Sequence, residues 1–286
     1  MMENPVHLRL QSLTRHFGGL TATDDVSLEI PQGQLLAVVG PNGAGKSTLI
    51  QLITGFLRPD SGHIRFDGHD ITGRKPEAIA ALGVARTFQT SRVFPGLSVF
   101  DSVMVGVQAE LLGGGRWPHR RGPFRELLDV LLHRRAYREQ LRSLETRAEQ
   151  VLQLFGERLW PHRDSPAFGL SYANRRRLEI ARALVAEPRL LLLDEPTAGM
   201  NPTETAELTE LIHQLHADRP DLTIVLVEHK LHVVRRLAHR VVVMNQGAVL
   251  VDETPEEALD DPRVIEAYLG KRAASGALLL EETNRA

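Results

Sequence analysis

Apolar runs of strand length occur in two parts of this chain, one before residue 90 and one after residue 187. Alternation at Val26, Leu28 and Ile30 is typical of a half-buried strand, and the unbroken run Leu190 to Leu193 is typical of a strand buried on both faces. The pattern predicts strands over 6–11, 23–30, 35–39, 63–66, 83–89, 190–193, 222–227, 240–244 and 248–251. Helices are expected to begin near residues 46, 76, 202, 230, 255 and 262. This alternation indicates an α/β fold.

The segment from about 98 to 186 has a different pattern, because helical periodicity replaces the strand signals. One apolar stripe consists of Phe124, Leu127, Leu128, Leu131 and Leu132, and a second of Leu141, Leu144, Ala148, Val151, Leu152 and Phe155. We therefore predict one domain over 6–254, with a core from 6–89 and 188–254 and an inserted helical subdomain over 90–187. C-terminal helices and a tail would occupy 255–286.

A glycine-rich stretch lies between the predicted strand 35–39 and the next helix. It reads Gly40-Pro41-Asn42-Gly43-Ala44-Gly45-Lys46-Ser47-Thr48 and matches the phosphate-loop pattern G-x-x-x-x-G-K-[ST]. In this context the loop N–H groups and the helix N-terminus converge on a polyphosphate. Lys46 would contact the β- and γ-phosphates, and the Ser47 hydroxyl would hold Mg²⁺. A turn that merely ends a strand is the alternative, but lysine is scarce in this chain, which argues against a chance match.

Polar residues end three more of the predicted strands. Asp194 and Glu195 follow the leucine run, His229 follows the next buried strand, and Gln89 ends the strand before the helical segment. Ligands bind at the carboxyl ends of parallel strands, so Asp194 would hold Mg²⁺ and Glu195 would polarise the attacking water. His229 would donate a hydrogen bond to a γ-phosphate, and Gln89 would sense the γ-phosphate or Mg²⁺. The alternatives are an acidic pair that starts a turn and a structural histidine.

Two further positions allow two interpretations each. Phe17 precedes the phosphate loop, where an adenine ring could stack on it, but a phenylalanine that anchors a turn explains it almost as well. Ser171 begins a helix and is a good N-cap, while an anion site at the same helix N-terminus is the other interpretation. The residues alone do not decide between them.

Composition narrows the class of protein. Of the 286 residues, 42% are hydrophobic and 24% charged, as in globular proteins, and the net charge of −2 gives no case for a nucleic-acid partner. The arginines of 116–142 alternate with acidic residues, which favours a solvated helix face. The absence of cysteine excludes disulfides and fits a reducing compartment. With no signal peptide and no apolar run near about eighteen residues, we expect a cytosolic chain that serves a membrane only through a partner.

Taken together, these stretches resemble the ATP-binding subunits of ABC transporters over about residues 6–270. In this resemblance Gly40 to Thr48 is the Walker A motif, Gln89 is the Q-loop glutamine, and Leu170-Ser171-Tyr172-Ala173-Asn174 is the signature. Asp194 belongs to the Walker B motif, and Glu195 is the catalytic base. Ala198 to Asn201 is the D-loop, and His229 is the switch histidine. It implies an α/β P-loop NTPase (ABC ATPase) fold with a RecA-like core, an N-terminal antiparallel β-subdomain and an inserted helical subdomain. It also implies ATP and Mg²⁺ as cofactors.

Within that superfamily the chain resembles the branched-chain amino acid import branch. The stretches that carry this are Arg15 to Leu20, Ala85 to Gln89, Arg176 to Arg182, Ala198 to Pro202 and Val264 to Gly270. The resemblance implies a second ATP-binding subunit, in a homodimer or heterodimer, in which Ser171 to Asn174 of one chain completes the site built on Lys46 of the other. Integral membrane permease subunits and, indirectly, a solute-binding protein are the other implied partners, on the cytoplasmic face of the membrane.

The chain departs from the family pattern at four places. Ala173 replaces a signature glycine, which a Cβ permits only if the backbone does not require a positive φ. Asn174 replaces glutamine, Asn201 stands where aspartate is frequent, and Lys230 follows the histidine where aspartate is usual. These departures concern rate and coupling, not class.

Other functions are compatible with a phosphate loop. A related importer of urea or amides, or a lipopolysaccharide exporter, would share these motifs. A non-transport ABC ATPase usually carries two cassettes or a long coiled-coil insertion, and this chain has neither. A small-molecule kinase would not need the signature or His229 at these places.

Overall fold

A parallel sheet with one antiparallel edge forms the centre of the molecule. The structure, a computed structural model, describes residues 5–87, 94, 96–111 and 134–269. The sheet order is β10-β9-β3-β8-β7-β6, where β3 (Leu35–Val39), β8 (Thr223–Val227), β7 (Leu190–Asp194) and β6 (Val84–Arg86) are parallel neighbours. β9 (Arg240–Asn245) pairs in parallel with β3, and β10 (Ala248–Glu253) pairs antiparallel with β9. The strands therefore end side by side at one edge.

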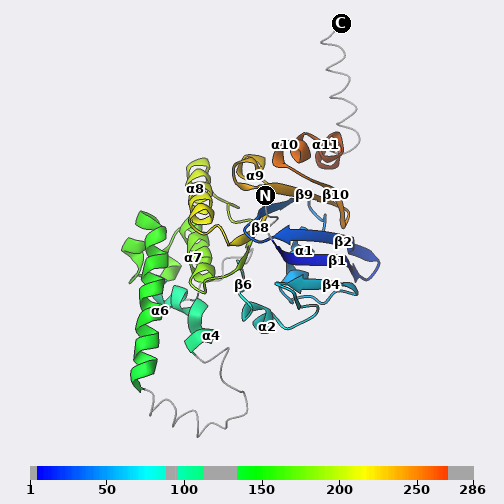
Figure 1. Cartoon of the computed structure of the whole chain (residues 1–286). Coiled ribbons are helices and arrows are strands. Elements are labelled where there is room, and N and C mark those ends of the chain that lie inside the picture. Colours follow the sequence, from blue (N-terminus) through cyan, green and yellow to red (C-terminus); the bar gives the residue numbers. More distant parts are fainter. Residues whose placement is uncertain (1–4, 88–93, 95, 112–133, 270–286) are drawn as a thin grey trace.

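The N-terminal segment forms a separate antiparallel sheet of order β2-β1-β4-β5 (Figure 1). Its strands are β1 (Val6–Phe17), β2 (Leu20–Pro31), β4 (Ser61–Phe66) and β5 (His69–Asp70). The first two are longer than expected from the sequence. The register of β1 with β2 shifts between Leu10 and Leu13, and Ser12 has φ +48°. This bulge breaks the apolar alternation at the point where the sequence pattern ends.

Alternate residues of β3 point into different apolar clusters. Leu36 and Val38 pack with the antiparallel sheet and α1 (Lys46–Ile53), whereas Ala37 and Val39 pack with helices that follow β8 and β10. Those helices are α9 (Leu231–Leu237), α10 (Pro255–Asp260) and α11 (Pro262–Leu269). A short helix, α2 (Pro76–Ala80), precedes β6.

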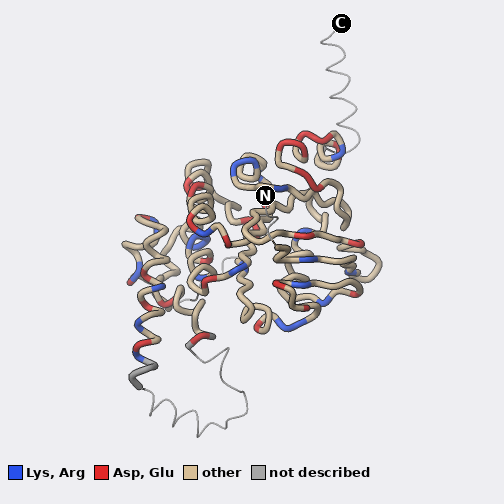
Figure 2. Tube along the Cα trace, viewed as in Figure 1, with Lys and Arg blue, Asp and Glu red and all other residues tan. Residues whose placement is uncertain are grey.

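The segment between β6 and β7 is helical, as expected. Its described helices are α3 (Val99–Met104), α4 (Gln108–Leu111), α6 (Arg134–Leu154) and α7 (Tyr172–Leu184), with short 3-10 turns at 105–107, 156–158, 160–162 and 167–169. The predicted stripe from Leu144 to Phe155 is buried, and it joins one cluster with Leu191 and Leu193 of β7 and with α8 (Pro202–Asp218). This segment lies on the side of the sheet opposite β1 and β2 (Figure 1). Charges of both signs alternate along α6 (Figure 2).

The predicted order of strands and helices is confirmed wherever the structure describes the chain. The apolar stripe at 124–132, Gln89 and the tail from 270 onward lie outside the described residues. The division into a core and an inserted helical subdomain stays a prediction. The described helices of that segment share their apolar cluster with the sheet.

Candidate nucleotide-binding site

The glycine-rich loop connects β3 to α1, as the sequence predicts. Gly45, directly before α1, has φ +102°, and a Cβ there would lie 2.2 Å from the carbonyl oxygen of Ala22 in β2. Only glycine fits this combination of left-handed backbone and close approach. Asn42 and Gly43 are exposed, and Ser47 and Thr48 are half-buried in the first turn of α1. The helix N-terminus is therefore open to an anion.

Lys46 folds back over the loop that precedes it. Its ammonium donates hydrogen bonds to the carbonyl oxygens of Gly40, at 2.7 Å, and of Pro41, at 3.0 Å. Burial lowers the pKa of Lys46, and the nearby carboxylates of Glu195 and Asp194 act in the opposite direction. The lysine thus belongs to the same electrostatic site as the two acids.

Glu195 and His229 contact each other at the carboxyl ends of β7 and β8. The distance from Glu195 Oε1 to His229 Nε2 is 2.9 Å. Glu195 has φ +49°, which turns the chain out of the strand, and its N–H donates to the carbonyl oxygen of Val227 at 2.9 Å. Two side chains from different strands, predicted separately, are therefore brought together beside the strand that carries the phosphate loop.

Asp194 is buried and pairs with an arginine that sequence reasoning did not single out. Arg86, at the end of β6, donates from Nη2 to Asp194 Oδ2 at 3.0 Å. The other oxygen, Oδ1, is buried and has no hydrogen-bond partner among the described residues. A hard cation prefers such an oxygen ligand, so Asp194 fits the predicted role toward Mg²⁺. The only signal for Arg86 in the sequence is its place within the predicted strand 83–89.

Hydrogen bonds from the two residues that flank His229 reach the predicted D-loop and the threonine directly before it. Glu228 accepts hydrogen bonds from the hydroxyl and the N–H of Thr197, at 2.6 and 3.0 Å. Lys230 donates to the carbonyl oxygens of Thr197 and Met200, at 3.1 and 3.3 Å, and to the hydroxyl of Thr205 at 2.7 Å. The lysine that replaces the usual aspartate therefore holds the D-loop backbone against the end of β8.

The signature stretch lies on a different face of the sheet from the phosphate loop. Ser171 caps α7 and accepts a hydrogen bond from the N–H of Asn174 at 3.3 Å, so the N-cap interpretation is confirmed. Ala173 lies inside this helix and is not among the residues with positive φ, so its Cβ is compatible with the backbone. α7 packs in the cluster of the helical segment, and α1 packs in the cluster of the antiparallel sheet. One chain does not bring Ser171 to Lys46.

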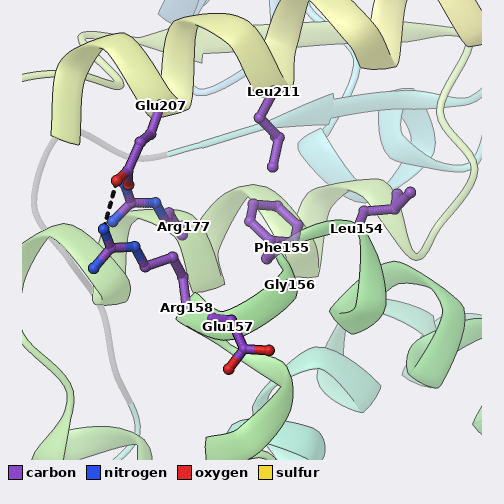
Figure 3. Close-up of a pocket in the computed structure, with 8 residues that line it drawn as sticks. All are labelled: Leu154, Phe155, Gly156, Glu157, Arg158, Arg177, Glu207 and Leu211. Atoms are coloured by element: carbon purple, nitrogen blue, oxygen red, sulfur yellow. Dashed lines mark hydrogen bonds and ion pairs between the residues drawn. The ribbon is translucent and has the colours of Figure 1, made fainter. Parts of the chain in front are cut away.

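Arg177 anchors this stretch to the neighbouring helix α8. It donates to Asn174 Oδ1 at 3.0 Å and to Glu207 Oε2 at 2.9 Å. Figure 3 shows Glu207 reaching down from α8 toward Arg177 and Arg158. Tyr172 is half exposed, at 48%, and its ring borders Gly199 of the D-loop.

Phe17 ends β1 beside the hairpin that borders the loop. Phe17 is 44% exposed, and the guanidinium of Arg15 lies over its ring, 5.1 Å from the ring centroid. Adenine stacking on Phe17 stays a prediction. Gln89 lies outside the described residues.

Comparison with known proteins identifies the family. The model of the ABC transporter family matches residues 23–198. A LivG protein of Salmonella typhimurium, described as a high-affinity branched-chain amino acid transport ATP-binding protein, is 40% identical over 270 residues, which cover 94% of this chain and all of that protein. This chain belongs to the ABC transporter family.

Other comparisons agree with this membership. The BraF protein of Pseudomonas aeruginosa, with the same description, is 39% identical over 275 residues, covering 94% of this chain and 100% of BraF. Among solved structures, the ADP conformation of MJ1267, an ATP-binding cassette of an ABC transporter, has a TM-score of 0.74 at 27% identity and covers 94% of this chain and 100% of its own. The expected ABC ATPase fold and the expected ATPase class are confirmed.

A second family model matches the end of this ABC transporter chain. It is described as the branched-chain amino acid ATP-binding cassette transporter model and covers residues 254–274. The described part of that range contains α10 and α11. Among the residues that the structure describes, no helix is both long enough and apolar enough to cross a bilayer.

Proposed function

We propose that this chain hydrolyses ATP to drive import of branched-chain or other hydrophobic amino acids through a membrane permease. The solute class is supported by the descriptions of LivG and BraF and by the family model over 254–274. The single observation that carries the ATPase site is the 2.9 Å contact between Glu195 and His229, next to the strand that leads to Lys46.

In the proposed mechanism, residues of the phosphate loop, of β1 and of the ends of β7 and β8 act on the nucleotide. Loop N–H groups and Lys46 bind the phosphates, and Phe17 stacks on the adenine. Glu195 polarises the attacking water, and His229 donates a hydrogen bond to the γ-phosphate. A general base of this kind contributes about 10²–10⁴-fold to the rate.

In this proposal Mg²⁺ would be held by Ser47, Asp194 and Gln89. Mg²⁺, when bound with ATP, supplies charge neutralisation at the phosphates. Asp194 offers its unpartnered Oδ1, and the Arg86 pair fixes the orientation of that carboxylate. Gln89 follows β6 in the chain and would report the state of the site to the helical segment.

The working unit in this proposal is a two-fold dimer with two composite ATP sites. Ser171, Tyr172, Ala173 and Asn174 of one chain meet the nucleotide on Lys46 of the other, because an isologous interface brings each patch to its complement twice. The separation of α7 from α1 within one chain supports this. ATP favours the closed dimer over the open one, and hydrolysis releases it. The chain would sit on the cytoplasmic face, with permease subunits and, indirectly, a solute-binding protein.

The test is reconstitution with membrane permease subunits of the branched-chain amino acid type and a solute-binding protein that delivers to them. Leucine or valine should stimulate ATP hydrolysis, and Glu195→Gln should lower the rate about 100-fold or more while the nucleotide Kd stays near that of the wild type. Glu210→Gln, an exposed acid on α8, is the matched control and should keep full activity. Full activity in Glu195→Gln would refute its role, and stimulation by urea but not by leucine would refute the solute class.

A further inference from the structure

The C-terminal helix α11 reaches the first residue of the phosphate loop. The N–H of Gly40 donates a hydrogen bond to the hydroxyl oxygen of Tyr268 at 2.8 Å, across 228 residues of sequence. The carbonyl oxygen of the same glycine accepts from Lys46 at 2.7 Å. Both polar groups of Gly40 are thereby engaged, one by the C-terminal helix and one by the phosphate-binding lysine.

Gly40 has little freedom to move away from this contact. It is buried, its φ is +144°, and a Cβ on it would lie 2.1 Å from the carbonyl oxygen of Met244 in β9. A buried N–H without a partner is costly, so the Tyr268 hydroxyl fixes the orientation of the peptide that begins the loop.

α11 is anchored on the same strand that carries Gly40. Val264 is 3% exposed and packs in one apolar cluster with Val39, the residue directly before Gly40. Tyr268 lies four residues after Val264 and therefore on the same helix face. Through these two contacts α11 packs on the end of β3 and on the first residue of the phosphate loop. A displacement of this helix would therefore change the backbone position of Gly40.

We propose that Tyr268 is a positioning residue that preorganises the phosphate loop for nucleotide, and that the position of α11 is thereby coupled to ATP binding. This inference rests on the nucleotide site proposed above. A loop that is already ordered loses less conformational freedom when nucleotide binds, so the hydroxyl strengthens binding without touching the nucleotide. By the reciprocity of linked equilibria, nucleotide binding also strengthens the hold on α11.

The experiment compares Tyr268→Phe with wild type in nucleotide binding and hydrolysis. The substitution keeps the ring and removes only the hydroxyl, so the Kd for MgATP and the KM should rise about threefold to tenfold, the range of one net hydrogen bond, with kcat nearly unchanged. Ile265→Ala is the matched control, because Ile265 lies on the same helix and is 43% exposed. Its Kd should equal that of the wild type.

A second measurement uses the wild-type sequence. The chain has three tyrosines, so protein labelled with fluorotyrosine gives three ¹⁹F signals, and the one lost in Tyr268→Phe belongs to Tyr268. That signal should shift when MgADP binds. An unchanged Kd in Tyr268→Phe, an equal rise in Ile265→Ala, or a Tyr268 signal that does not respond to saturating MgADP would each overturn the inference. If the wild type binds no nucleotide at all, both the proposed function and the inference about Tyr268 fail. If the wild type binds nucleotide but Tyr268→Phe has an unchanged Kd, only the inference about Tyr268 fails.

Discussion

At the residue scale, the buried carboxylate of Asp194 is paired with the guanidinium of Arg86. Its side chain is 1% exposed, and the Arg86 guanidinium that pairs with it is 10% exposed. Both charges are therefore largely removed from water, and each depends on the other for compensation. Glu195, one residue later, turns away to His229. Adjacent acids thus have separate partners and separate roles.

Removal of the Arg86 charge should destabilise the fold. Arg86→Gln leaves Asp194 buried and unpaired, and the loss of one partner of a buried pair costs about 3 kcal/mol or more of unfolding free energy. Urea unfolding without nucleotide measures this. Arg235→Gln removes an exposed pair with Asp260 and should cost about 1 kcal/mol or less. Equal effects of the two substitutions would show that Asp194 does not depend on Arg86.

At the scale of elements, Glu207 joins the signature helix to the core helix. Its side chain extends from α8, accepts a hydrogen bond from Arg177 of α7 at 2.9 Å, and also forms an ion pair with Arg158 (Figure 3). Arg177 is 2% exposed, and burial lowers its pKa while the Glu207 charge opposes that shift. The bridge keeps Asn174 in place because the same guanidinium binds its side-chain oxygen.

Glu207→Gln should therefore loosen α7 from α8. It removes the only negative charge paired with Arg177 among the described residues, and because Glu207 itself is 37% exposed the loss should be about 1–2 kcal/mol. Arg158→Gln is the control, since it leaves the Arg177 pair intact and should have a smaller effect. Hydrogen exchange in α7 should increase only in Glu207→Gln. A larger effect in Arg158→Gln would contradict this account.

The sequence predicts helices and strands better than it predicts contacts between residues far apart in the chain, because helices and strands depend on local periodicity. Strands 190–193 and 222–227 were predicted because a strand buried on both faces is continuously apolar. β1 was predicted too short because the bulge near Ser12 breaks its period. The functional side chains on strand ends followed from the rule that parallel strands end at one edge.

The contacts that the sequence missed join residues far apart in the chain. Three such contacts join Arg86 to Asp194, Lys230 to the D-loop and Tyr268 to Gly40. They depend on which elements become neighbours in the fold, and local periodicity carries no information about that. The family resemblance supplied the predicted role of Ser171 toward the nucleotide. It did not supply these three contacts.

At the scale of the whole molecule, each proposed ATP site requires two chains. Lys46 and Ser171 belong to elements in different apolar clusters of one chain, α1 and α7. In a two-fold dimer every site would combine Lys46 of one chain with Ser171 of the other. Two variants that are each inactive can then complement each other.

The most direct test mixes Lys46→Ala with Ser171→Arg protein and measures ATP hydrolysis. Each variant alone should be inactive. In an equimolar mixture about half of the dimers are mixed, and each mixed dimer has one site with both native residues, so about a quarter of the wild-type rate should return. If Lys46 and Ser171 had to act within one chain, no mixed dimer would hold an intact site. A mixture as inactive as its components would therefore contradict the composite site.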